Sequence, residues 1–85
     1  MPGVDLIETG IADLNRGIES VEALLVSIGA DRLSQLGLPV HSPITRPEHR
    51  LYAELARDDP NSAHSRYNAL VRRLVSFERA AECAS

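Results

Sequence analysis

The spacing of its apolar residues most constrains what this chain can fold into. From residue 7 to residue 28, apolar residues recur at alternating steps of four and three. These steps place them on one face of an α-helix, in the pattern of a helix packed lengthwise against another. The pattern predicts one long helix over about residues 4–28, with an inward face made of Ile7, Ile11, Leu14, Ile18, Val21, Leu25 and Ile28.

A second stripe with the same steps predicts another long helix, over about residues 60–82. Asp59 and Pro60 favour a helix start, because aspartate accepts backbone N–H bonds and the donor that proline lacks is unused in a first turn. The stripe consists of Ala63, Tyr67, Leu70, Leu74, Phe77 and Ala81, and it is widened on one side by Val71 and Val75.

Two shorter helices are predicted between the stripes. The first covers about residues 31–36 and ends at Gly37, since glycine readily takes the left-handed conformation that stops a helix. Residues 38–47 contain three prolines and no apolar period, which indicates a loop. The second short helix covers about residues 46–57.

The start of this second short helix has the capping-box spacing, with Thr45 three residues before Glu48. Arg46 lies between them and precedes a proline, a position that disfavours helical backbone angles. The side chains that we expect this helix to bury are those of Leu51, Tyr52 and Leu55.

The four predicted helices define an all-α fold, a small helical bundle in which residues 1–85 form one domain. The two long helices are expected to run antiparallel, because the short ones carry the chain back between them. Charges beside the stripes agree with this pairing: Glu8 and Glu22 flank the first stripe, and Arg66 and Arg73 flank the second. Acid facing base along a helix seam favours one orientation.

A second edge of the first predicted helix favours dimerisation. It carries Gly10 and Gly17 between Leu6 and Leu24. Glycine inside a helix costs up to about 1 kcal/mol relative to alanine, so two glycines one heptad apart suggest that another backbone comes close. One long partner and two short helices leave part of this surface uncovered. We therefore expect a homodimer that pools the stripes, with Tyr67, Leu70, Leu74 and Phe77 in its interface.

The charges are unevenly distributed along the chain. Residues 1–31 carry six carboxylates and one arginine, whereas residues 32–85 carry eight arginines and six carboxylates. All basic residues other than histidine are arginine, which suits bidentate pairing with carboxylate or phosphate. With a sequence pI near 5.5, the chain lacks the basic footprint of a dedicated nucleic-acid binder.

Composition also bears on the compartment. The longest wholly apolar stretch is Ala23–Val26, far below the roughly 20 residues of a membrane span. The first residues lack the basic and apolar segments of a secretory signal. Cys83 is the sole cysteine, so no disulfide forms within the chain. We expect a cytoplasmic protein without a membrane partner.

The candidate chemical groups lie in residues 58–73 and at Arg57 directly before them. Arg57 and His64 are separated by six residues, which resembles the R-x4–6-H motif of the HEPN-type ribonuclease and toxin domains. That resemblance implies an all-helical, usually dimeric protein that cleaves RNA. Histidine can move a proton near neutral pH, and arginine can stabilise the charge of a phosphorane. Tyr67 is the third catalytic candidate, although Asp59 and Pro60 interrupt the motif.

Other chemistries have less support in the sequence. The residues around His64 resemble those of histidine-phosphotransfer domains, but Arg66, Tyr67 and Asn68 replace the leucine-lysine-glycine run of that family. No two histidines are three or four residues apart, the spacing that places two ligands on one helix face. We expect neither a metal site nor a cofactor.

The sequence therefore favours a small, non-enzymatic helical module for protein–protein interaction or regulation, which self-associates through its stripes. Arg72 and Arg79 on the outer face of the last helix, with the loop at residues 38–47, are the predicted partner-binding elements. An RNA-binding or RNA-cleaving protein that uses Arg57 and His64 is the alternative, so nucleic acid remains open as a partner.

Overall fold

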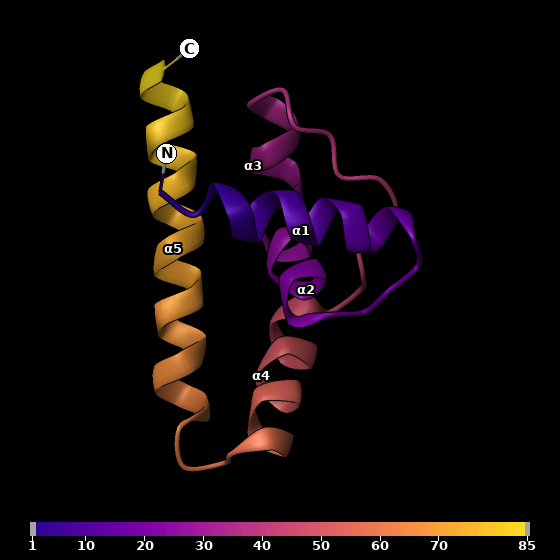
Figure 1. Cartoon of the computed structure of the whole chain (residues 1–85), viewed down its shortest axis with the longest axis vertical. Helices are drawn as coiled ribbons and strands as arrows, with labels where there is room; N and C mark the ends of the chain where they lie inside the picture. Colours follow the sequence, from indigo (N-terminus) through magenta and orange to yellow (C-terminus); the bar gives the residue numbers. More distant parts are fainter. Residues whose placement is uncertain (1, 85) are drawn as a thin grey trace.

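The structure is a computed structural model that describes residues 2–84, and all of the regular secondary structure within them is helical, as predicted (Figure 1). None of the helices in this range is long and apolar enough to cross a membrane. Five helices are formed by the described residues: α1 (Val4–Asn15), α2 (Val21–Ile28), α3 (Ala30–Gln35), α4 (Pro47–Asp58) and α5 (Ala63–Ala84).

The prediction of one helix over residues 4–28 is wrong, because the chain turns between α1 and α2. Gly17 adopts φ +74°, and its N–H donates to the carbonyl of Leu14. The N–H of Ile18 donates to the carbonyl of Asp13, which completes a Schellman stop. The side-chain oxygen of Ser20 then accepts from the N–H of Ala23 and caps α2.

The break lets α1 fold back onto α2, and the two helices touch at Gly10. A β-carbon on Gly10 would lie 2.4 Å from the carbonyl oxygen of Glu22 and 2.7 Å from Cγ1 of Val26. The expectation that a backbone comes close is confirmed at Gly10. It is wrong at Gly17, which has no atom within 4 Å of such a position and serves the turn instead.

Helix α2 is the centre of the molecule and packs against α1, α3, α4 and α5. Every residue from Ala23 to Ser27 is buried. The hydroxyl of Ser27 donates to the carbonyl of Ala23 and accepts from the N–H of Ile44, so it fastens the 38–46 loop to the core. The buried apolar residues are Ile7, Ala23, Leu24, Leu25, Val26, Leu33, Val40, Leu51, Leu55, Ala63, Leu74 and Phe77.

The predicted antiparallel pairing of two long helices does not form. Figure 1 shows α1 beginning beside α5 and running away from it at a steep angle, while α4 and α5 make the antiparallel pair. Ile18, a member of the first stripe, lies in the turn and is 47% exposed. Several stripe residues do lie in the core of the single chain: Ile7, Leu25, Leu74 and Phe77 are buried, and Ile11, Leu14, Val21, Ile28, Tyr67 and Leu70 pack against them.

The short helices begin differently from the prediction. Helix α3 starts at Ala30 and ends before Gly37, which has φ +90° as the stop signal requires. Thr45 does not cap α4: the cap position is Arg46, at φ +51°, and no side chain caps the helix. The proline at position 47 explains why the helix starts after Arg46, since it disfavours right-handed helical angles at the residue before it.

Two further expectations are corrected in α4 and α5. Tyr52 was expected in the core but is 40% exposed, whereas Leu51 and Leu55 are fully buried. Helix α5 starts at Ala63 rather than residue 60, because residues 60–62 form a turn. In that turn the Asp59 carboxylate accepts from the N–H of Asn61.

The contact at Gly10 can be tested by Gly10→Ala. Helix propensity alone would stabilise α1 by about 1 kcal/mol. Because the new methyl group would clash with the Glu22 carbonyl, we expect a net loss of roughly 1–3 kcal/mol in the free energy of unfolding. Chemical denaturation measures it. Thr9→Ala, at the neighbouring exposed position, is the control and should change stability by less than about 0.5 kcal/mol. A Gly10→Ala protein more stable than the native one would contradict the contact.

The break after α1 can be tested by placing aspartate at two stripe positions. Ile18→Asp should change the unfolding free energy by no more than about 0.5 kcal/mol, because Ile18 already faces solvent. Leu25→Asp should cost at least about 4 kcal/mol, because it removes a buried leucine and buries a charge. Thermal or urea unfolding followed by circular dichroism measures both. Equal, large losses would instead favour an unbroken helix.

Candidate functional site

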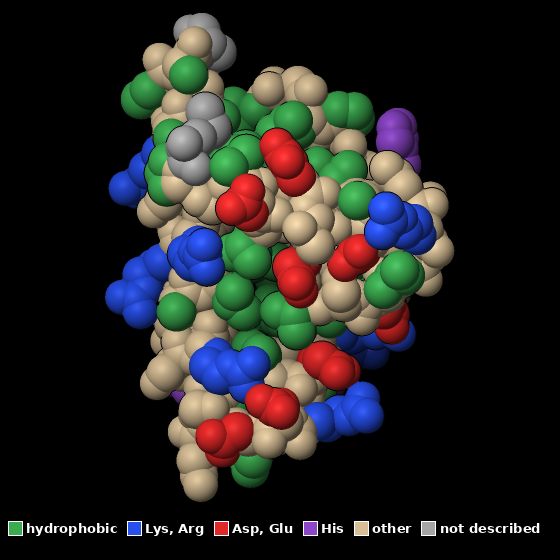
Figure 2. Space-filling view, viewed as in Figure 1, with side chains coloured by type: hydrophobic (Ala, Val, Ile, Leu, Met, Phe, Trp, Pro, Cys, Tyr) green, Lys and Arg blue, Asp and Glu red, His purple; other side chains and the backbone are tan. Residues whose placement is uncertain are grey.

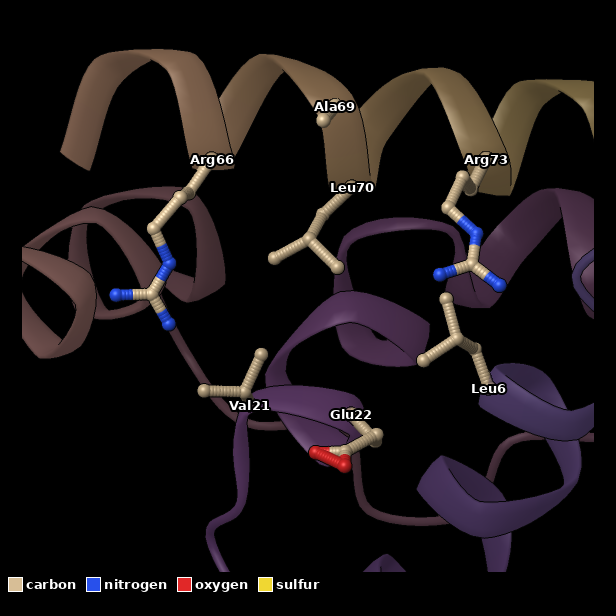
Figure 3. Close-up of a pocket in the computed structure, with 7 residues that line it drawn as sticks. All are labelled: Leu6, Val21, Glu22, Arg66, Ala69, Leu70 and Arg73. Atoms are coloured by element: carbon tan, nitrogen blue, oxygen red, sulfur yellow. The ribbon is translucent and has the colours of Figure 1, made fainter. Parts of the chain in front are cut away.

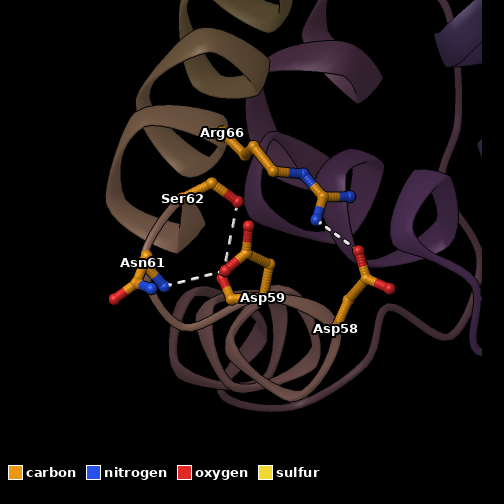
Figure 4. A network of polar contacts seen from close by, with 5 residues as sticks. All are labelled: Asp58, Asp59, Asn61, Ser62 and Arg66. Atoms are coloured by element: carbon orange, nitrogen blue, oxygen red, sulfur yellow. Dashed lines mark hydrogen bonds and ion pairs between the residues drawn. The ribbon is translucent and has the colours of Figure 1, made fainter.

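The α4–α5 turn, which holds much of the polar segment singled out in the sequence, is a small network of local bonds (Figure 4). The Asp59 backbone carbonyl accepts from the N–H of Ser62 and the Ser62 hydroxyl. A guanidinium N–H of Arg66 donates to the Asp58 carboxylate at 2.7 Å. These contacts shape the turn and connect the two helices.

Arg57 and His64 are held by different neighbours. The Arg57 guanidinium pairs with Glu54 of its own helix at 3.2 Å, and its side chain is 78% exposed. It borders a small polar depression on α4 that also includes Glu19 and Arg50, which pair at 2.8 Å. Nε2 of His64 lies 3.1 Å from the amide nitrogen of Asn68 on α5. The two catalytic candidates therefore do not converge on one depression.

Tyr67, the third candidate, is only partly buried. Its ring centroid lies 5.8 Å from that of Tyr52, with the rings tilted by 59°. Burial, and to a smaller extent the Glu48 carboxylate, raises the pKa of the Tyr67 phenol above its ordinary value. The phenol is therefore neutral at physiological pH, and its ring helps to hold α4 against α5.

The acidic, cysteine and histidine side chains do not gather into a metal-binding group. Among residues 2–84, no three of them lie close enough to hold an ion. Cys83 is exposed near the end of α5. No buried side-chain nitrogen or oxygen lacks a hydrogen-bond partner in this part of the chain.

The predicted partner-binding arginines, Arg72 and Arg79, are exposed on α5. Nε of Arg72 lies 3.4 Å from the carbonyl oxygen of Asn68, a contact within the helix. Neither arginine lines the concave surface that α5 forms with α1 and α2.

That concave surface is a groove of about 460 Å³ between α5 and the α1–α2 pair. Figure 3 shows Leu70 pointing from α5 into it, with Val21 and Leu6 on the opposite side. All three side chains are partly buried and pack against the core. We call this surface the α5 groove; it is lined by Leu6, Val21, Glu22, Arg66, Ala69, Leu70 and Arg73.

The charges of the α5 groove are separated by side. Arg66 and Arg73 come from α5, whereas Glu22 comes from α2 opposite them (Figure 3). Arg66 is already paired with Asp58. Figure 2 shows the same separation more widely: apolar side chains form a strip, arginines follow its α5 side, and carboxylates gather over α1 and α2.

Sequence reasoning found parts of this groove without finding the groove itself. The heptad spacing had already identified Glu22, Arg66 and Arg73 as flanking charges. It assigned them to a seam between two long helices, and that seam does not form. The sequence placed Leu6 on the second edge of the first predicted helix, but nothing in it indicated that Leu6 and Ala69 line one surface, because that depends on how α1 and α5 pack.

Comparisons of the chain with protein-family models, with curated proteins and with solved structures found no significant match. What the protein does is therefore inferred from its own side chains and their geometry.

Arg57 pairs with Glu54, whereas His64 contacts Asn68, so the two side chains do not share a site. We therefore expect no RNA cleavage by the native chain. Incubation with a generic transcript measures this directly. Arg57→Ala and His64→Ala should each preserve the helical circular dichroism signal, and each should alter stability by less than about 1 kcal/mol, because both contacts are exposed. Cleavage by the native chain that both substitutions abolish would contradict this expectation and favour the ribonuclease alternative.

Proposed function

We propose that this protein is a small, non-enzymatic helical module for protein–protein interaction, and that the α5 groove is its binding surface. The observation that supports this most is the groove itself, an apolar depression bordered by separated charges. An amphipathic helix can lay its apolar face in such a depression and place its charged flanks on the rims. The rim charges would set the orientation of the bound segment.

The choice of binding over catalysis rests on where the polar groups lie. A hydrolytic site needs a base and a charge-stabilising group within reach of one reacting atom. Arg57 pairs with Glu54, and His64 contacts Asn68. The groove contributes two guanidinium groups and one carboxylate, which suit the pairing of opposite charges better than proton transfer near neutral pH.

The predicted use of the stripes for self-association needs revision within this proposal. Leu25, Leu74 and Phe77 are at most 3% exposed in the single chain. They stabilise the fold of one chain, and a second chain could reach them only if the bundle opened. A partner can instead contact the part of the second stripe that borders the groove, at Leu70.

Site-specific photo-crosslinking in the cells that make the protein tests this proposal. A benzophenone side chain is placed at Ala69, which borders the groove and is exposed, or at Arg72 on the outer face of the same helix. We expect light-dependent crosslinks to protein from position 69 and few or none from position 72.

Two results would count against the groove. Crosslinks from position 72 but not from position 69 would assign binding to the outer arginines, as the sequence alone suggested. An absence of protein crosslinks at both positions would contradict the interaction module. Circular dichroism of both purified variants checks that each retains the native helical fold.

A further inference from the structure

We infer that the occupant of the α5 groove is a second copy of this chain, related to the first by a two-fold axis parallel to α5. This inference rests on the proposed binding role of the groove and names its partner. The groove is complementary to a second copy of itself, because its two sides carry opposite charges.

The direction of the axis follows from those charges. In a two-fold dimer each copy presents the same patch, and an axis along the groove exchanges its two sides. Glu22 of the second copy then lies over the α5 side of the first. Figure 3 shows Glu22 at a level between Arg66 and Arg73 along α5, so this carboxylate faces the gap between the two arginines.

Arg73 is the stronger electrostatic partner of the two. Arg66 already donates to Asp58 at 2.7 Å, whereas Arg73 has no ion pair among residues 2–84. Glu22 likewise has no ion pair in the described part of the chain. Dimerisation about this axis places Glu22 of each copy near Arg73 of the other. The symmetry therefore creates two such pairs of opposite charges.

The other face-to-face arrangement has its axis across the groove and is electrostatically unfavourable. It would lay one α5 antiparallel on the other, with Arg66 against Arg73 of the second copy. Glu22 would then face Glu22 of the second copy. Like charges placed opposite each other oppose association, so the charges select the axis that runs along α5.

The apolar side chains match in the favoured arrangement. Exchange of the two sides places Leu70 over Val21 and Leu6 of the second copy. These are the partly buried residues that line the groove, so dimerisation would shield them further from water. The contact involves no residue that must leave the core of the single chain.

Charge reversal across the groove tests both the partner and the axis. Sedimentation equilibrium of the native chain should show a dimer that weakens as salt is added, because salt screens exposed charges. Glu22→Arg and Arg73→Glu should each raise the dimer dissociation constant by roughly tenfold or more, because each change creates two like-charged pairs.

A mixture of the two variants provides the decisive measurement. A Glu22→Arg chain has only basic groups at positions 22 and 73, and an Arg73→Glu chain has only acidic ones. Mixed in equal amounts they should form a heterodimer at least as tightly as the native homodimer. Arg79→Glu, on the same helix but outside the groove, is the matched control and should leave the dimer constant within about twofold.

The alternatives give distinct results. An Arg73→Glu chain that self-associates more tightly than the native one would overturn the proposed axis, because the crossed arrangement pairs Arg66 with the new glutamate. A native chain that stays monomeric at concentrations on the order of 100 µM would overturn self-association.

The position-69 crosslinks separate this inference from the proposed function. Crosslinks between two copies of the chain support both. Crosslinks only to a different protein, together with a monomeric native chain, would overturn the second copy as the occupant and keep the groove as a binding surface. Crosslinks to no protein at all would contradict both.

Discussion

The direct contact of Gly10 with the backbone of α2 is the constraint on which the rest of the structure depends. A side chain at this position would clash with the carbonyl oxygen of Glu22, so only glycine lets α1 lie so close. Because α1 lies so close, it covers one side of α2, a short helix in which residues 23–27 are all buried. The remaining helices then pack around α2, with α4 and α5 closing the other sides.

The same contact produces the groove. Because α1 begins beside α5 and runs away from it, it covers α5 only near its own start, where Gly3 approaches the backbone of Arg73. The stretch of α5 around Leu70 therefore faces the corner between α1 and α2 rather than a full-length partner helix. An apolar stripe made for lengthwise packing is left partly open, and charged residues that flank it become the rims.

Much of the second half of the chain could be predicted from its sequence. The period from Ala63 to Ala81 correctly identified the inward face of α5. Nearer the start of the chain, Gly37 correctly ended the short helix before it. The first half misled for a physical reason. The steps of four and three run through Ile18 without interruption, and Gly17 was interpreted as a point of close packing. It is the left-handed residue of a Schellman stop, followed by a serine cap at Ser20.

By itself the sequence determined the helical class, the inward face of α5 and the charges at Glu22, Arg66 and Arg73, because periodicity and side-chain chemistry are local properties. Only the tertiary structure decided which helices pair and which part of an apolar face stays open. Those outcomes depend on one close contact between residues twelve positions apart, Gly10 and Glu22. A local pattern cannot distinguish a helix that continues from one that stops and folds back, since both present the same period.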